Sequence, residues 1–414
     1  MSSLREIYND SLIKNTIYLI STQFFNLILG FFFWVIAARG YSPNEIGIAS
    51  ALISSMFLIV LISTLGFPTT LQFFLPRDNQ NAGIIINSCI IICIVASLLI
   101  SLVFIIGLDI WAQPLESTIR DPKVALAFVL ITTASTVSGL IGGAFIAGKR
   151  SSFQMAKETL FGFVKILPLP FFLGFGAMGI FFSWGIGLML SSLLGFILLP
   201  FVWKGYLPIP RLDPIIKKMA YFSIGNYLVV IFSTLPRLAL PIVIVNIVSP
   251  ESTGFFFIAM TVAGILYGIP YSLSASLLTE SSEEGEFRKK ILKAIKFNFI
   301  LLLSGVFLFI LFGKSVLNLF NPSYGENAST TLRILALTSI PLSINTIFTV
   351  IRNVQKRILS IVIFNAVIAI ITLVLSVPFL RTYGIEGAAM AYLAANTFAA
   401  IIVIYIMKNK FNSL

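Results

Sequence analysis

The chain has 414 residues, of which 58% are hydrophobic and 11% are charged, and its mean hydropathy is +1.00. These values exclude an ordinary soluble domain and indicate a helical membrane protein that crosses the bilayer several times. The formal net charge is +12 and the chain has no histidine. Histidine-based acid–base catalysis and histidine metal sites are therefore excluded, and we expect neither a metal nor a cofactor.

Apolar segments follow one another along the chain, each long enough to cross a bilayer at ~20 residues per crossing. They are predicted at residues 15–38, 46–66, 82–107, 124–147, 159–177, 180–203, 220–248, 254–278, 297–318, 329–351, 358–380 and 386–407. Prolines predict breaks in several of these helices, namely Pro168, Pro170, Pro236, Pro241, Pro270 and Pro341. The predicted fold is an all-α bundle of about twelve transmembrane helices.

The second half of the sequence echoes the first at an offset of about 207 residues. The matching pairs are Ser42 with Ser249, Gly47 with Gly254, Lys149 with Lys356, and, at 208, Gly176 with Gly384. The shared offset predicts two six-helix lobes, residues 1–206 and 207–414, related by a parallel internal repeat. A proline-containing linker at residues 204–218 would join them. Duplicated bundles of this kind are typical of transporters that place the substrate between their halves.

The distribution of basic residues predicts the orientation. With a cytoplasmic N-terminus, twenty of the 28 Lys and Arg residues fall in inner segments, five in outer segments and three inside spans. The positive-inside rule therefore predicts a multi-pass protein of the cell membrane with both termini cytoplasmic. Basic tracts such as Arg288-Lys289-Lys290 would contact anionic membrane lipids, so the net charge reflects topology and not nucleic-acid binding.

Arg237 is the most informative intramembrane residue. An arginine near the middle of a span costs ~2.5–3.5 kcal/mol on insertion scales, which a water-filled cavity, a partner or a substrate normally offsets. Asn226, Ser233 and Arg237 are spaced seven and four residues apart and share one helical face. Gln23 and Asn26 form a matching stripe in the first span. We predict that the two stripes line a central substrate cavity; the alternative is that Arg237 snorkels or bonds neighbouring carbonyls.

Two further cations, Lys165 and Arg333, fall inside predicted spans and are secondary candidates, although both could simply snorkel to an interface. No Asp or Glu falls squarely within a predicted span, and Glu158 stands at an edge. Proton- or sodium-driven antiporters usually carry an intramembrane acid. A cavity with fixed positive charge instead favours anionic substrates, and arginine matches phosphate oxygens bidentately.

Three segments carry a family resemblance: residues 37–47, the stretch from Pro236-Arg237 to Ser249-Pro250-Glu251, and residues 383–389. They resemble the first span, the seventh span and the loop before the last span of Wzx-like oligosaccharide flippases, in the superfamily that includes multidrug and toxin extruders. In that family an acid commonly precedes the arginine, and Pro236 stands in its place here.

The resemblance implies a two-lobe bundle that alternates between inward-open and outward-open states and moves a polyprenyl-diphosphate-linked oligosaccharide to the outer leaflet. Arg237 would hold the diphosphate, while Gln23, Asn26 and Ser233 would contact sugar hydroxyls. Glycan polymerases or ligases are the implied protein partners.

Three alternatives remain open at this point. A cation-coupled multidrug exporter of the same superfamily needs intramembrane acids, which the predicted spans lack. A membrane glycan ligase needs acidic or histidine catalysts and a substantial outer loop, whereas the largest outer loop spans only residues 108–123. In a non-transporting scaffold, the two polar stripes would have no function. We therefore expect a transporter and not an enzyme.

Overall fold

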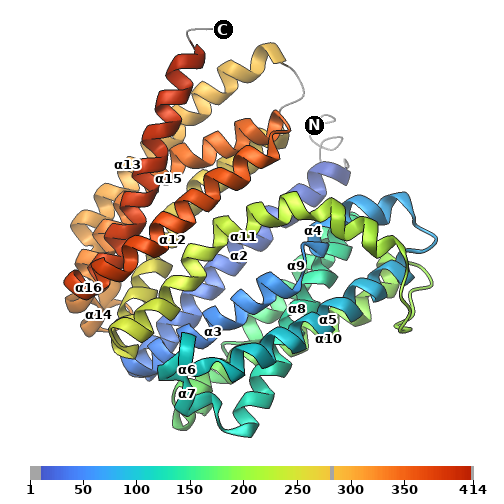
Figure 1. Cartoon of the computed structure of the whole chain (residues 1–414), viewed down its shortest axis with the longest axis horizontal. Helices are drawn as coiled ribbons and strands as arrows, with labels where there is room; N and C mark the ends of the chain where they lie inside the picture. Colours follow the sequence, from blue (N-terminus) through green and yellow to red (C-terminus); the bar gives the residue numbers. More distant parts are fainter. Residues whose placement is uncertain (1–10, 280–283, 412–414) are drawn as a thin grey trace, which may run out of the picture. The chain divides into compact units, whose positions relative to one another are not determined.

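The computed structural model describes residues 11–279 and 284–411, and these form helices without any strand (Figure 1). The first half contains α2 (Ser11–Gly40), α3 (Pro43–Ser63), α4 (Phe67–Phe74), η1 (Leu75–Arg77), α5 (Ala82–Ile106), α6 (Leu108–Trp111), α7 (Gln113–Ile119), α8 (Pro122–Ala147), α9 (Ser151–Val164), η2 (Leu169–Phe175) and α10 (Ala177–Val202). The second half contains α11 (Ile215–Ile247), α12 (Pro250–Thr279), α13 (Glu284–Asn318), α14 (Pro322–Asn327), α15 (Ser329–Val354) and α16 (Ile358–Phe411).

The helices account for the predicted crossings. In the described residues, 10 helices are long and apolar enough to span a membrane, and α9 with η2 forms one more, bent by 53°. The long helix α16 consists of two helices that meet at Gly384, where the backbone leaves the helical conformation. The predicted break at Pro168 and Pro170 is the bend between α9 and η2. The prolines of α11, α12 and α15, in contrast, lie inside helices that continue on both sides.

The internal repeat is visible in the backbone itself. Lys149 and Lys356 have positive φ angles of 55° and 56°, which non-glycine residues rarely adopt. The next amide closes the same turn in both halves: Arg150 N donates to Phe145 O at 3.0 Å, and Arg357 N donates to Arg352 O at 2.9 Å. This is the bond that ends a helix in a Schellman motif. The same helix ending thus recurs at the predicted offset of 207 residues.

Gly384 has φ 58° and ψ −141°, and its repeat partner Gly176 has φ 54° and ψ −138°. This region is available essentially to glycine alone. A Cβ on Gly384 would meet no atom within 4 Å, so only the backbone opposes a side chain there. We expect Gly384→Ala to destabilise the protein by ~1–3 kcal/mol, measured as a lower melting temperature in detergent. Gly30→Ala in α2, also without close neighbours, should not lower it; equal melting of both variants would contradict the assignment.

The chain packs as two compact units, which we call unit 1 (Met1–Tyr41 with Leu52–Tyr227) and unit 2 (Ser42–Ala51 with Leu228–Leu414). In unit 1, α4, α5 and α10 pack against α8, and α2 packs against α9. In unit 2, α12, α13 and α16 pack around α15. We retain the division at residues 206 and 207 as a proposal about the duplication, because the units describe packing and not sequence repetition.

Residues 42–51 bring the start of α3 into unit 2, where it crosses the start of α12. A Cβ on Gly47 would overlap the carbonyl oxygen of Pro250, and a Cβ on Gly254 would overlap that of Pro43. Two backbones approach this closely only where side chains are absent. Since Gly47 and Gly254 are repeat-related, the crossing joins equivalent positions of the two halves.

The predicted linker is fixed to α5 of unit 1. Asn87 Nδ2 donates to Leu207 O at 2.6 Å, and Tyr206 donates its hydroxyl proton to Asn87 Oδ1 at 2.9 Å. Ser88 Oγ donates to Arg211 O at 2.9 Å and accepts from Asp213 N at 2.8 Å. Burial disfavours the phenolate and raises the pKa of Tyr206 to about 12.

Candidate functional site

Unit 1 contains a buried charge cluster on α9. Lys157 is 1% exposed, and its Nζ lies 2.8 Å from Glu158 Oε1. The same ammonium donates to Ser138 Oγ at 2.7 Å and to Ser138 O at 3.3 Å, both on α8. These contacts compensate the lysine charge with one carboxylate and two neutral oxygens, as a buried cation requires.

Glu158 joins this cluster to α2. Its carboxylate accepts from Gln154 Nε2 at 3.1 Å and from Asn26 Nδ2 at 3.4 Å. The sequence placed Glu158 at the edge of a span beginning at residue 159, and the helix that carries it starts further toward the N-terminus. The helix begins at Ser151, whose backbone N–H donates to Asn15 Oδ1 at 3.1 Å. The carboxylate therefore lies well inside α9.

Lys165 lies at the bend that follows α9 and is only 4% exposed. Its Nζ is 4.3 Å from the ring centroid of Trp184, 4.4 Å from that of Phe161 and 5.3 Å from that of Phe33. Ring faces carry negative electrostatic potential and stabilise a cation in such a position. Lys165 forms no ion pair with the described residues. The ammonium is held by aromatic rings and does not reach the molecular surface.

The stripe predicted in the seventh span lies on one continuous helix, α11. Ser233 and Arg237 are exposed residues of unit 2, and Ser233 Oγ donates to Val230 O at 3.1 Å. Asn226 is half-buried on the part of α11 that belongs to unit 1. Among the described residues, Arg237 has no hydrogen bond or ion pair. The central cavity between two stripes stays a prediction.

The remaining candidates separate from one another. Gln23 is exposed on α2, whereas Asn26 is half-buried and joins the Glu158 cluster. Arg333 is exposed near the start of α15 and belongs to unit 2. Sequence reasoning missed Lys157, Trp184 and Phe161. A charged Lys157-Glu158 pair one turn before an apolar run was the available signal, but the contact with Ser138 arises only from helix packing.

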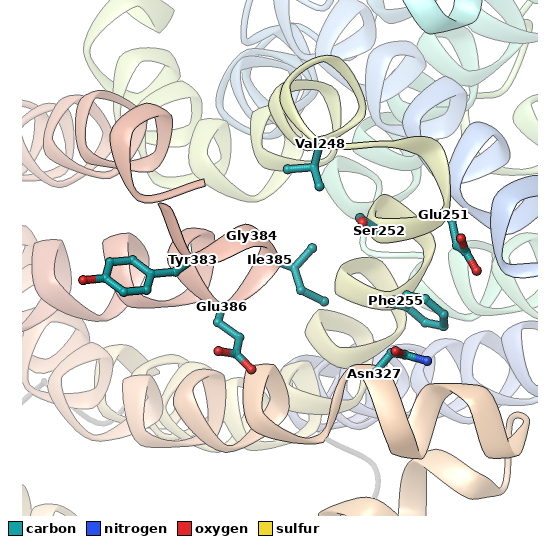
Figure 2. Close-up of a pocket in the computed structure, with 9 residues that line it drawn as sticks. All are labelled: Val248, Glu251, Ser252, Phe255, Asn327, Tyr383, Gly384, Ile385 and Glu386. Atoms are coloured by element: carbon teal, nitrogen blue, oxygen red, sulfur yellow. The ribbon is translucent and has the colours of Figure 1, made fainter. Parts of the chain in front are cut away.

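A pocket of about 540 Å³ lies in unit 2 where α12 begins and α16 reverses at Gly384 (Figure 2). Figure 2 shows Glu386 contributed by the α16 reversal and Glu251 by the first turn of α12. Its other lining residues are Val248, Ser252, Phe255, Asn327, Tyr383, Gly384 and Ile385. Two carboxylates and no cation line it, so this pocket repels anions and is unsuited to a phosphate-bearing substrate.

No family model and no curated protein matches the sequence. Solved structures do match. An inward-facing MATE-family multidrug resistance transporter of the MOP superfamily aligns with a TM-score of 0.71 and 17% identity, covering 94% of each chain. The lipid II flippase MurJ, in an inward closed conformation, aligns with a TM-score of 0.71 and 16% identity, covering 95% of this chain and 87% of that one.

The chain shares its fold with these two solved structures. A third match is a MOP transporter from Pyrococcus furiosus described as having a binding pocket of reversed polarity, with a TM-score of 0.60 and 16% identity over 97% of this chain and 96% of that one. This fold hosts both multidrug exporters and a lipid flippase. Because one fold can host different functions, function depends on the residues of the site.

Proposed function

We propose that this protein moves an anionic oligosaccharide linked to a polyprenyl (di)phosphate from the cytoplasmic to the outer leaflet by alternating access. One observation carries the proposal: the charges inside unit 1 are unequal in number. Lys157 and Lys165 are both buried, and of the carboxylates only Glu158 accompanies them within α9. Because Lys157 already pairs with Glu158, Lys165 remains as uncompensated positive charge. Such a field favours anions and disfavours cationic drugs.

Arg237 is the residue we assign to the diphosphate. Its guanidinium is exposed on α11 and has no partner among the described residues, so it is available to a ligand. Arginine binds phosphate oxygens through two parallel hydrogen bonds, a geometry lysine cannot provide. In this proposal Gln23, Asn26, Asn226 and Ser233 contact the glycan, and Lys165 and Arg333 add to the positive field.

The membrane potential supplies a driving force that needs no coupling acid. Moving two negative charges outward across an inside-negative membrane gains ~4–5 kcal/mol per 100 mV. Flipping by the purified protein in liposomes should then accelerate when an inside-negative potential is imposed. The proposal places the protein in the cell membrane with both termini cytoplasmic, beside the enzymes that polymerise or ligate the flipped glycan.

We expect Arg237→Ala to reduce flipping at least tenfold, because a charge-assisted bidentate contact contributes ~1.5–3 kcal/mol. The measurement is mass spectrometry of lipid-linked glycans in host cells that lack the chain and carry either wild type or the variant. A polyprenyl-diphosphate glycan should accumulate without the protein, disappear with wild type and persist with Arg237→Ala. Arg381→Ala, at another exposed arginine of unit 2, is the matched control and should behave as wild type.

A cation-coupled drug exporter is the second candidate, favoured by Glu158 inside α9. In that case, expressing cells would tolerate cationic drugs at higher concentrations, and Glu158→Gln would abolish this resistance. Unchanged lipid-linked glycans in cells lacking the chain, together with such resistance, would replace the flippase proposal by this one.

A further inference from the structure

Unit 2 contains a second cavity of about 200 Å³, bounded by α11, α15 and both halves of α16. Its volume exceeds the ~150 Å³ of a protein cavity that accepts one benzene ring. There is thus room for one six-membered ring. Its polar lining includes Ser233, Asn345, Thr346, Thr349, Asn365 and Asn396.

No lining residue of this cavity carries a charge, which limits the ligand to a neutral molecule. Burying an ion requires a counter-charge, and the cavity offers only amides and hydroxyls. Two asparagines fix each other on facing helices: Asn345 Nδ2 donates to Asn396 O at 3.0 Å and to Asn396 Oδ1 at 3.2 Å. The lining is therefore an uncharged polar surface, in which the Asn345 side chain is held in place by its hydrogen bonds to Asn396.

Several polar atoms of the lining can still form hydrogen bonds with a ligand. Thr346 Oγ1 donates to Leu342 O at 2.7 Å and Thr349 Oγ1 donates to Thr346 O at 2.7 Å, so both hydroxyls keep lone pairs that accept. Asn345 Oδ1 is buried and has no donor within the described chain. Asn365 is 9% exposed, and its amide makes no hydrogen bond with any described residue.

Free acceptors together with one free amide match a ligand that both donates and accepts at several points. Vicinal hydroxyls around a ring have this property, and apolar neighbours such as Phe232 and Ile368 suit the C–H face of such a ring. We infer that the cavity of unit 2 binds one uncharged sugar ring, with Asn365 and Thr346 as its polar contacts. The inference rests on the proposed function only in assigning that ring to the transported glycan.

The test uses the full-length protein in detergent with free glucose, galactose and N-acetylglucosamine as probes, followed by saturation-transfer NMR and thermal shift. At least one sugar should bind wild type. Asn365→Ala and Thr346→Val should each weaken that binding about twofold to tenfold, as expected for one net hydrogen bond. Thr372→Val is the matched control, because Thr372 Oγ1 also donates to its own helix, to Ile368 O at 2.7 Å, but Thr372 does not line the cavity.

Binding of no probe sugar, or binding that both variants leave unchanged, would overturn the inference. A second result would also overturn it: sodium chloride, but not potassium chloride, raises the melting temperature of wild type, and both variants abolish this effect. The cavity would then hold a cation. A liposome assay separates this inference from the proposed function. If wild type binds a sugar but flips no lipid-linked glycan, only the proposed function fails. If wild type flips and the variants bind and flip equally well, only the sugar site fails.

Discussion

Replacing Gly47 by alanine should prevent unit 2 from folding, the largest effect we expect from a single added methyl group. The new Cβ would occupy the position of the Pro250 carbonyl oxygen, which is backbone and cannot rotate away. Overpacking a core by one methylene typically costs ~1–3 kcal/mol when side chains can shift, and more when they cannot. We expect at least ~3 kcal/mol here, because the two backbones must move apart at this contact.

The measurement is the yield of monodisperse protein by fluorescence-detected size exclusion, followed by its melting temperature in detergent. Gly254→Ala should have the same effect, because its Cβ would overlap the Pro43 carbonyl. Gly264→Ala is the matched control on the same helix, since nothing lies within 4 Å of its Cβ position, and it should express normally. Normal yield and melting of Gly47→Ala would show that α3 and α12 do not cross at these glycines.

Lys157→Met should give the second-largest loss, about 2–3 kcal/mol of unfolding free energy. Removing one member of a buried ion pair costs ~3–5 kcal/mol, because the remaining charge is left without compensation. The lower figure applies because the Glu158 side chain is 22% exposed and keeps its bonds from Gln154 and Asn26. Ser138 Oγ would also lose its bond to the ammonium.

Thermal unfolding of four proteins, wild type, Lys157→Met, Glu158→Gln and the double variant, forms a double-mutant cycle. The double variant should be more stable than Lys157→Met alone, because no unpaired charge remains. Lys204→Met, at an exposed lysine, should leave the melting temperature unchanged. Additive losses in the cycle would mean that the two side chains do not interact.

Hydropathy alone predicted almost every membrane-spanning helix, because a run of about twenty apolar residues seldom occurs except where a chain crosses a membrane. The offset of 207 residues predicted an internal repeat, and the paired helix endings at Lys149 and Lys356 confirm it. The bend in the fifth span followed from Pro168 and Pro170. These features depend on local chemistry, which a sequence displays directly.

The interior of the site depends on packing between distant segments and could not be predicted in this way. The rings around Lys165 come from Phe33, Phe161 and Trp184, on three different helices. None is unusual among 39 phenylalanines and 4 tryptophans. Asn345 and Asn396 likewise look like isolated polar residues until α15 packs against α16. Which residues meet depends on how one helix is aligned against another. The periodicity within a single helix does not show that alignment.

The crossing of α3 and α12 also constrains the order of events during synthesis. Residues 42–51 leave the ribosome about 207 residues before Pro250 and Gly254, the positions against which they pack. At ~5–20 residues per second, translation of the intervening chain takes roughly 10–40 s. Throughout that interval the first turns of α3 around Gly47 lack their native neighbour. Unit 2 can therefore be completed only after α3 has already entered the membrane. A nascent chain that stalls before α12 is made would expose the Gly47 region of α3 to the insertion machinery.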